Sequence, residues 1–323
     1  MKRDFLVSKT PLRISLFGGG TDFPYYFNKY ESNVVNFTIN KFSYVTLKYH
    51  NNLLFNEKFR LNYSEAENVK SIDQIKNKII KNSLIKNKMD IPIYLSTISD
   101  IPSGTGMGSS GSFCVGLLNC INNLNKNSKK KMSVALEATD IELRLGKENV
   151  GYQDQFAAAY GGFNHFIFNK KKTRVKNLIK YKRHLKLIID RSALLWTGKS
   201  RKSSSILNDL KKKLDTNLYT LKKMNNICLN FLDLLDNFSY NIFIDLIKEN
   251  SELKNSLSEK INNKKFEKMI KNNRKVIASK ILGAGGDGFI LCFFKDKKDK
   301  NIFLKENKNS LDYIFCDHGS IIV

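Results

Sequence analysis

The sequence of 323 residues predicts an α+β fold. Segments with strand character and segments with helical character both occur, but they do not alternate as the regular β-α-β units of a doubly wound parallel sheet. Apolar residues make up 41% of the chain, which is enough to bury a sizeable core. A chain of this length fits two domains of ordinary size. No run of residues approaches the ~18–20 uncharged apolar positions that a membrane-spanning helix needs.

Alternating polarity and β-branched or aromatic residues predict the strands, and apolar residues spaced three or four apart predict the helices. In chain order the expected elements are a strand at 4–17 that ends in three glycines, strands at 33–39 and 42–49, a helix at 71–88, a strand at 91–99, helices at 109–124 and 132–146, and strands at 165–168 and 185–190. Helices are expected through most of 203–276, followed by a glycine turn that runs into a strand within 281–294.

The formal net charge of +25 allows two interpretations. A nucleic-acid-binding protein would use such an excess to neutralise phosphates. However, only nine of the 55 basic residues are arginine, and the lysines are mixed with asparagine and isoleucine along the whole chain. This distribution is typical of solvated helix faces, so we expect no nucleic-acid surface. A positive field also suits a small ligand that carries several phosphates.

Cysteine and histidine usage argues against a disulfide framework and a structural metal. The five cysteines contain no C-x-x-C pair, and the four histidines lie far apart. We therefore expect free, buried thiols and no zinc site. The first residues lack the apolar region of a secretory signal, so we expect a cytoplasmic protein without a membrane partner.

The strongest motif lies in the segment 100–118, and we call residues 102–110 the glycine loop. Glycines at alternate positions are followed by Ser109, Ser110 and an amphipathic helix. Glycine lets the backbone approach a ligand closely, and the N-terminus of a helix presents free N–H groups. Together they predict a cradle for phosphates, although the segment is not a Walker A loop. The alternative is a glycine-rich connection before a serine-capped helix.

Three further motifs carry candidate site residues. The segment 151–162 places Asp154 between two glutamines, where it could accept a proton from a hydroxyl or cap the following helix. A strand carries Arg13 into a glycine turn that ends at Asp22. The segment 281–294 contains a second glycine turn, which would let the backbone approach a ligand.

The order of these four motifs resembles the GHMP kinases, the small-molecule kinases named for galactose, homoserine, mevalonate and phosphomevalonate. The chain has their P-x-R strand followed by glycines and T-D, their glycine loop ending in S-S, their G-x-x-D-Q segment and their late G-A-G-G-x-G turn. The resemblance spans nearly the whole chain. The segments GGGTDFPYYF, GYQDQFAAAYGG and TGKSRKSSSIL are most similar to a branch of sugar 1-kinases, whereas galactokinase-like members carry Glu-His in place of Gly19-Gly20.

The resemblance implies a ribosomal-protein-S5-like N-terminal domain at 1–182 and a ferredoxin-like C-terminal domain at 183–323, with ATP and substrate bound between them. It also implies roles for residues by motif. The ATP-binding residues would be Pro102, Ser103, Gly104, Thr105, Gly106, Met107, Gly108, Ser109 and Ser110. Ser110 and Glu142 would hold Mg²⁺, although Glu142 could also be a solvated helix residue.

The resemblance also implies that Asp154 is the catalytic base and that Arg13 is the cation beside it, unless Arg13 forms a surface salt bridge. The substrate-binding residues would be Gly19, Gly20, Thr21, Asp22, Gly151, Lys199, Arg201 and Gly285. Among them, Lys199 and Arg201 are candidates for a substrate phosphate far from the reacting hydroxyl. A solvated basic loop would explain these two residues almost as well.

The function that the resemblance implies is ATP- and Mg²⁺-dependent phosphorylation of the anomeric hydroxyl of D-glycero-D-manno-heptose 7-phosphate. The resulting 1,7-bisphosphate would feed the synthesis of nucleotide-activated heptose for surface polysaccharide. One alternative is a kinase for another sugar such as L-fucose, and an alternative from a different class is a basic nucleic-acid-binding protein. RNA binding would not require Asp154, Arg13 and the glycine loop together. A monomer and a homodimer are both compatible with the sequence.

Overall fold

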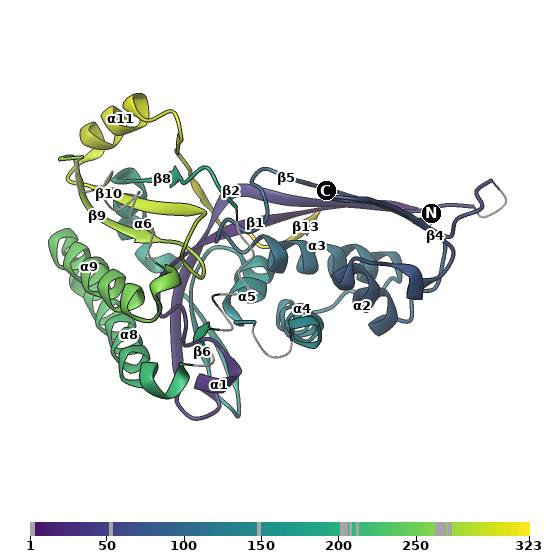
Figure 1. The fold of residues 1–323 in the computed structure, drawn as a ribbon, viewed down its shortest axis with the longest axis horizontal. Helices are drawn as coiled ribbons and strands as arrows, with labels where there is room; N and C mark the ends of the chain where they lie inside the picture. Colours follow the sequence, from purple (N-terminus) through teal and green to yellow (C-terminus); the bar gives the residue numbers. More distant parts are fainter. Residues whose placement is uncertain are drawn as a thin grey trace.

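The computed structural model describes residues 4–51, 54–146, 150–200, 206, 209–210, 213–261, 270 and 273–323 (Figure 1). Within these residues the strands form two sheets, one of nine strands and one of four. In the described residues every strand pair except one is antiparallel, which excludes a doubly wound parallel sheet. The predicted α+β class is therefore confirmed.

The larger sheet is built around a long strand near the start of the chain. Its strands are β1 (Phe5–Phe17), β2 (Ser32–Tyr49), β3 (Phe59–Asn62), β4 (Ala66–Val69), β5 (Ile93–Ser99), β6 (Phe163–Phe168), β7 (Thr173–Asn177), β12 (Phe315–Cys316) and β13 (Ile321–Ile322). β2 is central, because it pairs with β1, β5, β6 and β12. The last two strands bring the end of the chain back to this sheet.

Helices cover one face of the larger sheet (Figure 1). They are α1 (Pro24–Phe27), α2 (Lys78–Lys86), α3 (Ser109–Leu124), α4 (Lys131–Gly146) and α5 (Gln153–Tyr160), with a 3₁₀ turn η1 (Ile72–Gln74). α3 has the bounds that the sequence predicts and packs against β1 and β2. Because Leu117, Leu118 and Ile121 are fully buried there, the sheet determines where the first turn of α3 lies.

The smaller sheet has a ferredoxin-like topology. Its strands are β8 (Ser192–Trp196), β9 (Val276–Ile281), β10 (Phe289–Phe294) and β11 (Ser310–Leu311), and its helices are α8 (Leu214–Leu234), α9 (Tyr240–Ser256) and α11 (Lys297–Glu306). In the spatial order β11-β8-β10-β9, the last strand of this sheet in the chain, β11, lies beside the first, β8, and the third, β10, lies between β8 and the second, β9. This is the order of a β-α-β-β-α-β unit. The division at residue 182 stays a prediction.

Four predicted elements differ from the structure. Residues 185–190 were expected as a strand, but they belong to helix α6 (Lys182–Asp190). Their buried residues Leu185, Ile188 and Ile189 have helical spacing, and a window of six residues was too short to separate this spacing from a buried strand. The strands expected at 33–39 and 42–49 are the single strand β2, which bulges opposite Pro11 and Leu12. The helix expected at 71–88 is the turn η1 followed by the shorter α2.

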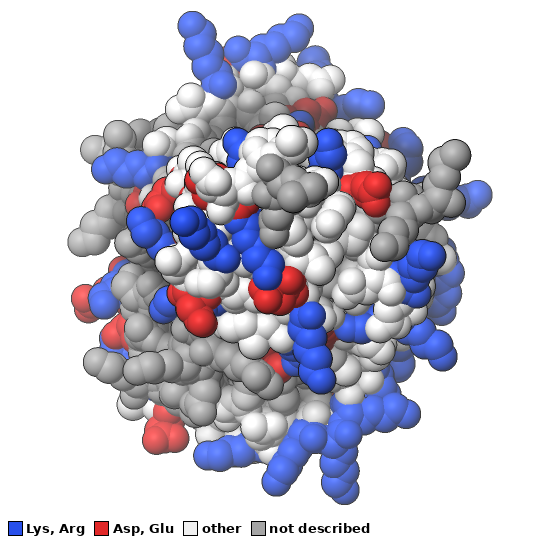
Figure 2. Space-filling model, turned by 90° about the vertical axis from the view of Figure 1, so that its right-hand side faces the viewer, with Lys and Arg blue, Asp and Glu red and all other residues white. Residues whose placement is uncertain are grey.

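Lysines and arginines are spread widely over the surface. On the face in Figure 2, basic side chains lie among acidic and uncharged ones and do not gather into one band. Exposed helical pairs such as Lys186 with Asp190 and Lys248 with Asp245 show how these charges are arranged. On this face the distribution agrees with solvated helices. None of the described helices is long and apolar enough to cross a membrane.

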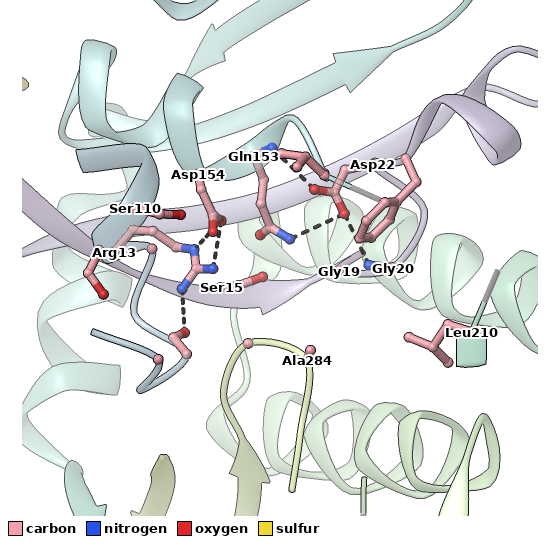
Figure 3. A pocket seen from close by; sticks show the side chains of 18 of the residues that line it. Arg13, Ser15, Gly19, Gly20, Asp22, Ser110, Gln153, Asp154, Leu210 and Ala284 are labelled. Carbon is pink, nitrogen blue, oxygen red and sulfur yellow. Dashed lines mark hydrogen bonds and ion pairs between the residues drawn. The ribbon is translucent and has the colours of Figure 1, made fainter. Parts of the chain in front are cut away.

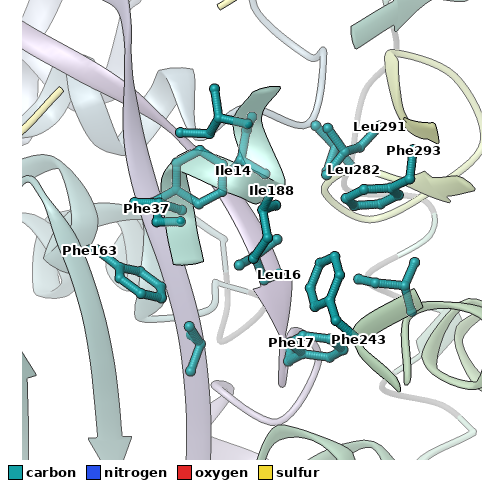
Figure 4. Packing of buried hydrophobic residues seen from close by; sticks show 14 of the residues in the cluster. Ile14, Leu16, Phe17, Phe37, Phe163, Ile188, Phe243, Leu282, Leu291 and Phe293 are labelled. Atoms are coloured by element: carbon teal, nitrogen blue, oxygen red, sulfur yellow. The ribbon is translucent and has the colours of Figure 1, made fainter. Parts of the chain in front are cut away.

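A single hydrophobic core joins the two sheets. Ile14, Leu16 and Phe17 at the end of β1 are fully buried between them (Figure 4). The Phe17 ring lies 4.7 Å from that of Phe231 in α8 and 6.0 Å from that of Phe243 in α9, measured between ring centroids. Each fully buried side chain of this kind contributes about 1.5–3 kcal/mol to folding. The end of β1 is therefore held in place by both parts of the chain.

The two glycine turns also pack directly against each other. The N–H of Phe289 donates to the carbonyl of Thr105 at 3.1 Å, and a Cβ added to Gly106 would lie 2.6 Å from the carbonyl oxygen of Leu282. A Cβ added to Gly283 would in turn collide with the Cα of Gly106. Two backbones can approach this closely only where neither carries a side chain. Gly106 is thus required by the contact between the two sheets.

We predict that Gly106→Ala destabilises the protein more than Gly198→Ala does. Both glycines have φ above +80°, but a Cβ at Gly198 would meet nothing within 4 Å. The left-handed backbone alone costs about 1–2 kcal/mol, and overpacking at Gly106 adds about 1–3 kcal/mol. Urea denaturation of both variants measures the free energy of unfolding. Equal losses in the two variants would contradict the backbone contact.

Candidate active site

A cavity of about 840 Å³ lies where the two sheets meet. β1 contributes Arg13 and Ser15 to its wall, and the start of α5 contributes Gln153 and Asp154 (Figure 3). The glycine loop lines one side, and Ala284 in the second glycine turn lies opposite β1. Segments from the start, middle and end of the chain therefore meet at one site, as the four sequence motifs predict.

The centre of the cavity is an ion pair between β1 and α5. Arg13 donates from Nε and Nη2 to Oδ1 of Asp154, at 2.9 and 2.6 Å, and from Nη1 to the carbonyl of Gly106 at 2.6 Å. The side chain of Arg13 is 4% exposed, so it is not part of a surface salt bridge. Both contacts to Asp154 use Oδ1, and Arg13 therefore leaves Oδ2 available to a hydroxyl group. The Arg13 guanidinium therefore links the carboxylate of Asp154 to the glycine loop.

Asp154 does not cap α5. The helix begins at Gln153, its N-cap residue is Tyr152, and no side chain makes the capping hydrogen bond. Asp154 occupies the second helical position, and its carboxylate is bonded to Arg13 from another element. The sequence leaves open whether Asp154 caps the helix or belongs to the site, and the structure favours the second interpretation.

The glycine loop and the first turn of α3 form one side of the cavity. Ser103, Gly104, Gly106, Gly108, Ser109 and Ser110 line it. The first N–H groups of a helix have no partner within the helix and carry the positive end of its dipole. Thr105 and Met107 point into the protein and are fully buried. The loop thus alternates between residues that face the cavity and residues that anchor the loop.

Glu142 is buried beside the glycine loop, which excludes the alternative of a solvated helix residue. Its side chain accepts hydrogen bonds from Gln155 and Ser110, and it is 6% exposed. Burial, with a smaller contribution from the charge of Asp154, raises the pKa of Glu142 to about 7, and the hydrogen bonds from Gln155 and Ser110 oppose this shift. A carboxylate and a hydroxyl that share a hydrogen bond are oxygen donors of the kind that Mg²⁺ prefers.

Asp22 is a second buried carboxylate, at the other end of the cavity. Its oxygens accept from the N–H of Gly20 at 3.1 Å and from the backbone and side chain of Gln153 at 3.1 and 3.2 Å (Figure 3). Burial raises the pKa of Asp22 to about 6, and the charge of Asp154 acts in the same direction. Gly151 passes so close to Asp22 that an added Cβ would collide with the carboxylate. Gly19, Gly20 and Gly151 line the cavity with Asp22.

Several predicted site residues lie away from the cavity. Thr21 is buried and donates to the carbonyl of Gly18 at 2.7 Å, and Gly285 packs against the side chain of Ile261. Lys199 is exposed and is not among the residues that line the cavity, although its neighbour Ser200 is. The prediction for Arg201 falls outside the described residues.

Sequence reasoning also missed residues that line the cavity. Ser15 lies two positions after Arg13 on β1, so the period of a strand places both on one face and could have identified it. Gln153 and Gln155 flank Asp154 and bind the two buried carboxylates. Lys254 and Lys280 had no local signal, because lysines are frequent along this chain.

The comparison with protein families identifies this domain. Residues 54–162, which include the glycine loop and Asp154, match the model of the GHMP kinases N terminal domain. The chain contains a GHMP kinase domain. GHMP kinases transfer a phosphoryl group to a hydroxyl of a small molecule, and the chain is accordingly a small-molecule kinase with an α+β fold.

Known proteins resemble this chain over nearly its full length. It is 27% identical to the D-glycero-alpha-D-manno-heptose 7-phosphate kinase of Campylobacter jejuni, over 97% of each chain. The solved structure of a D-glycero-D-manno-heptose 1-phosphate kinase from Bacteriodes thetaiotaomicron covers 98% of each chain with a TM-score of 0.80 and 21% identity. The mevalonate kinase of Methanococcus jannaschii covers 98% of this chain and 100% of its own, with a TM-score of 0.70 and 18% identity. These structures share the fold.

We predict that Glu142→Gln stabilises the metal-free protein at pH 8. Because the pKa of Glu142 is raised, the folded state binds its proton more tightly than the unfolded state, and stability is lost as the pH rises from about 4.5 to about 7. Above this range the ionised carboxylate costs up to about 3 kcal/mol, which the neutral amide avoids. Melting temperatures of both proteins in the presence of a chelator, between pH 5 and 8, measure the difference.

Glu137→Gln is a matched control on the same helix. Glu137 is 9% exposed but pairs with Lys129 at 2.6 Å and accepts from Asn87 at 2.8 Å, so its loss should lower stability at pH 8. The gain of Glu142→Gln should shrink as the pH falls to 5. A Glu142→Gln variant that is less stable than the wild type at pH 8 would show that the carboxylate is not strained by its burial.

Proposed function

We propose that this GHMP kinase is an ATP- and Mg²⁺-dependent sugar 1-kinase that phosphorylates the anomeric hydroxyl of D-glycero-D-manno-heptose 7-phosphate. The observation that carries the proposal is the ion pair of the buried Arg13 with Asp154, which lies in the cavity between the glycine loop and the buried Asp22. The relative named as a heptose 7-phosphate kinase matches the chain from end to end and supports the choice of sugar. The product would be the heptose 1,7-bisphosphate, a precursor for nucleotide-activated heptose and surface polysaccharide.

In this proposal the glycine loop binds the phosphates of ATP. Its cavity-facing glycines expose their backbone, and the N-terminus of α3 adds N–H groups and a positive dipole end. Ser110 and Glu142 fit Mg²⁺, because both are oxygen donors and the ion in kinases needs few protein ligands besides phosphate oxygens. When bound, the ion would neutralise charge on the phosphates.

Asp154 and Arg13 would act on the two reacting groups. The carboxylate of Asp154 would hold the anomeric hydroxyl and take its proton as the oxygen attacks the γ-phosphorus atom, with ADP as the leaving group. Phosphoryl transfer depends mainly on positioning and on stabilising charge at the phosphoryl oxygens. Arg13 is buried and held by Asp154 and Gly106, so its charge is already oriented before the substrates bind.

Asp22 would hold the sugar through other hydroxyl groups. Its carboxylate is oriented by three N–H donors and lies in the cavity wall. Hydroxyl groups of a sugar donate hydrogen bonds to a carboxylate, and a buried carboxylate without such donors is costly. A sugar that lacks the matching hydroxyl should therefore be a poor substrate.

We predict that Asp154→Asn lowers turnover by about 10²–10⁴ while ATP still binds, because the amide cannot accept the proton. Coupled detection of ADP measures the rate, and calorimetry measures ATP binding. Glu31→Gln is the control, since Glu31 forms an exposed ion pair with Arg174 at 2.8 Å, far from the glycine loop in sequence. The control should keep wild-type turnover. An Asp154→Asn variant within a few-fold of the wild type would show that Asp154 is not the base.

A panel of acceptors tests the substrate. We expect ADP release with D-glycero-D-manno-heptose 7-phosphate and a lower kcat/KM with the free heptose, L-fucose, galactose and mevalonate, because a site built for a phosphate loses charge-assisted hydrogen bonds without it. The measurement is the kcat/KM of each acceptor at saturating ATP. Equal use of the free and the phosphorylated heptose would contradict the proposed specificity, and a preference for L-fucose would identify another sugar kinase of the family.

A further inference from the structure

A buried lysine lies in the wall of the cavity, and the chemistry above does not use it. Lys280 on β9 is 4% exposed, lines the cavity and donates from Nζ to the carbonyl of Leu16 on β1. Its Nζ also lies 5.7 Å from the centroid of the Phe17 ring. A buried ammonium group needs an acceptor or a counter-charge, because its removal from water is costly.

Among the described residues, no carboxylate pairs with Lys280, whereas a comparable lysine has such a counter-charge. Lys300 is also 4% exposed and also donates to a carbonyl, that of Ile189 at 3.1 Å, but it pairs with the carboxylate of Asp312 at 2.7 Å. Among the described residues, the ionisable groups that act on Lys280 are the Cys228 thiol and the Arg13 guanidinium, and neither is a carboxylate. Burial lowers the pKa of Lys280 to about 7.

An unpartnered hydroxyl, among the described residues, lies on the residue that precedes the acceptor of this lysine. Ser15 precedes Leu16, whose carbonyl accepts from Lys280, and the Ser15 hydroxyl is buried, lines the cavity and has no hydrogen-bond partner among the described residues. A Cβ added to Gly19 would lie 3.4 Å from this hydroxyl and 3.4 Å from Nε2 of Gln153. The hydroxyl therefore faces the part of the cavity that holds Asp22 and Gln153 (Figure 3).

We propose that Lys280 and Ser15 form a phosphate-binding subsite on the acceptor side of the cavity. An ammonium group without a counter-ion and a free hydroxyl together provide donors for phosphate oxygens. The phosphate is either that of a phosphorylated acceptor or the phosphoryl group during its transfer past Arg13. The identity of the bound phosphate rests on the proposed kinase function, whereas the subsite itself needs only an anion as its ligand.

Steady-state kinetics of Lys280→Met separate the two sources, with Lys300→Met as the matched control. Loss of a charge-assisted hydrogen bond should lower kcat/KM by about 10- to 100-fold. If the loss is confined to the phosphorylated acceptor and appears in KM, the subsite holds the acceptor's own phosphate. If kcat falls equally with phosphorylated and free sugars, it holds the phosphoryl group in transit. Lys300→Met should stay within a few-fold of the wild type.

A binding measurement tests the subsite without turnover. Sulfate keeps its charge between pH 6 and 8.5 and replaces phosphate as the probe, and ADP occupies the glycine loop. Sulfate should raise the melting temperature of the ADP-saturated wild type at pH 6 but much less at pH 8.5, since Lys280 loses its proton near pH 7. Lys280→Arg should bind sulfate at both pH values, because arginine stays protonated. Lys280→Met should show only the general salt effect seen at equal ionic strength.

The Lys280→Arg variant separates the effect of Lys280 protonation on sulfate binding from the effect of other groups in the cavity that titrate. Asp22 and Glu142 have raised pKa values in the same range, and they and Asp154 are retained in all these variants. If the wild-type protein is inactive on every sugar but binds sulfate through Lys280, the proposed function is refuted and the subsite is supported. Sulfate binding and kinetics that are unchanged in Lys280→Met would overturn the subsite, whatever the substrate is.

Discussion

The site depends on the direct contact between two glycine turns that lie more than 170 residues apart in the chain. Gly106 and Gly283 touch through their backbones, and Phe289 donates to the carbonyl of Thr105 at 3.1 Å. This contact sets the distance between the two sheets and so the width of the cavity. It also orients the carbonyl of Gly106, which accepts the third hydrogen bond of Arg13 at 2.6 Å. A side chain at Gly106 or Gly283 would change all three features together.

Several charged groups are buried around the cavity, although their burial lowers the stability of the folded protein. Asp22, Glu142 and Lys280 are each buried, and burial moves the pKa of each toward the neutral form. The pairing of Lys300 with Asp312 and of Glu137 with Lys129 shows that the same chain neutralises buried charges elsewhere. Functional sites retain buried charged groups that have no oppositely charged side chain beside them, at a cost in stability, because the bound ligand supplies the opposite charge or the hydrogen bonds. In the proposed function these three buried groups are the ones that substrates and Mg²⁺ would contact.

The fold and the substrate are supported by different observations. Mevalonate, galactose and heptose kinases all share this two-sheet architecture with the chain, at 14% to 21% identity. A shared fold does not determine a substrate. In the proposed function, specificity would depend on the cavity wall on the acceptor side, where Asp22, Ser15 and Lys280 lie. This part of the wall comes from β1, from the turn after it and from β9.

The sequence by itself determined the features that depend on neighbouring residues. Glycine spacing followed by serines predicted the loop, and the spacing of apolar residues predicted the bounds of α3. The motif order predicted that Arg13, Asp154 and Asp22 would share a site. Only the tertiary structure decided which groups are buried and what they touch. Gly106 and Gly283 were expected to let the backbone approach a ligand, and in the structure their backbones also approach each other. Lys280 could not be distinguished from the other lysines, because its burial comes from packing against β1, more than 260 residues away in the sequence.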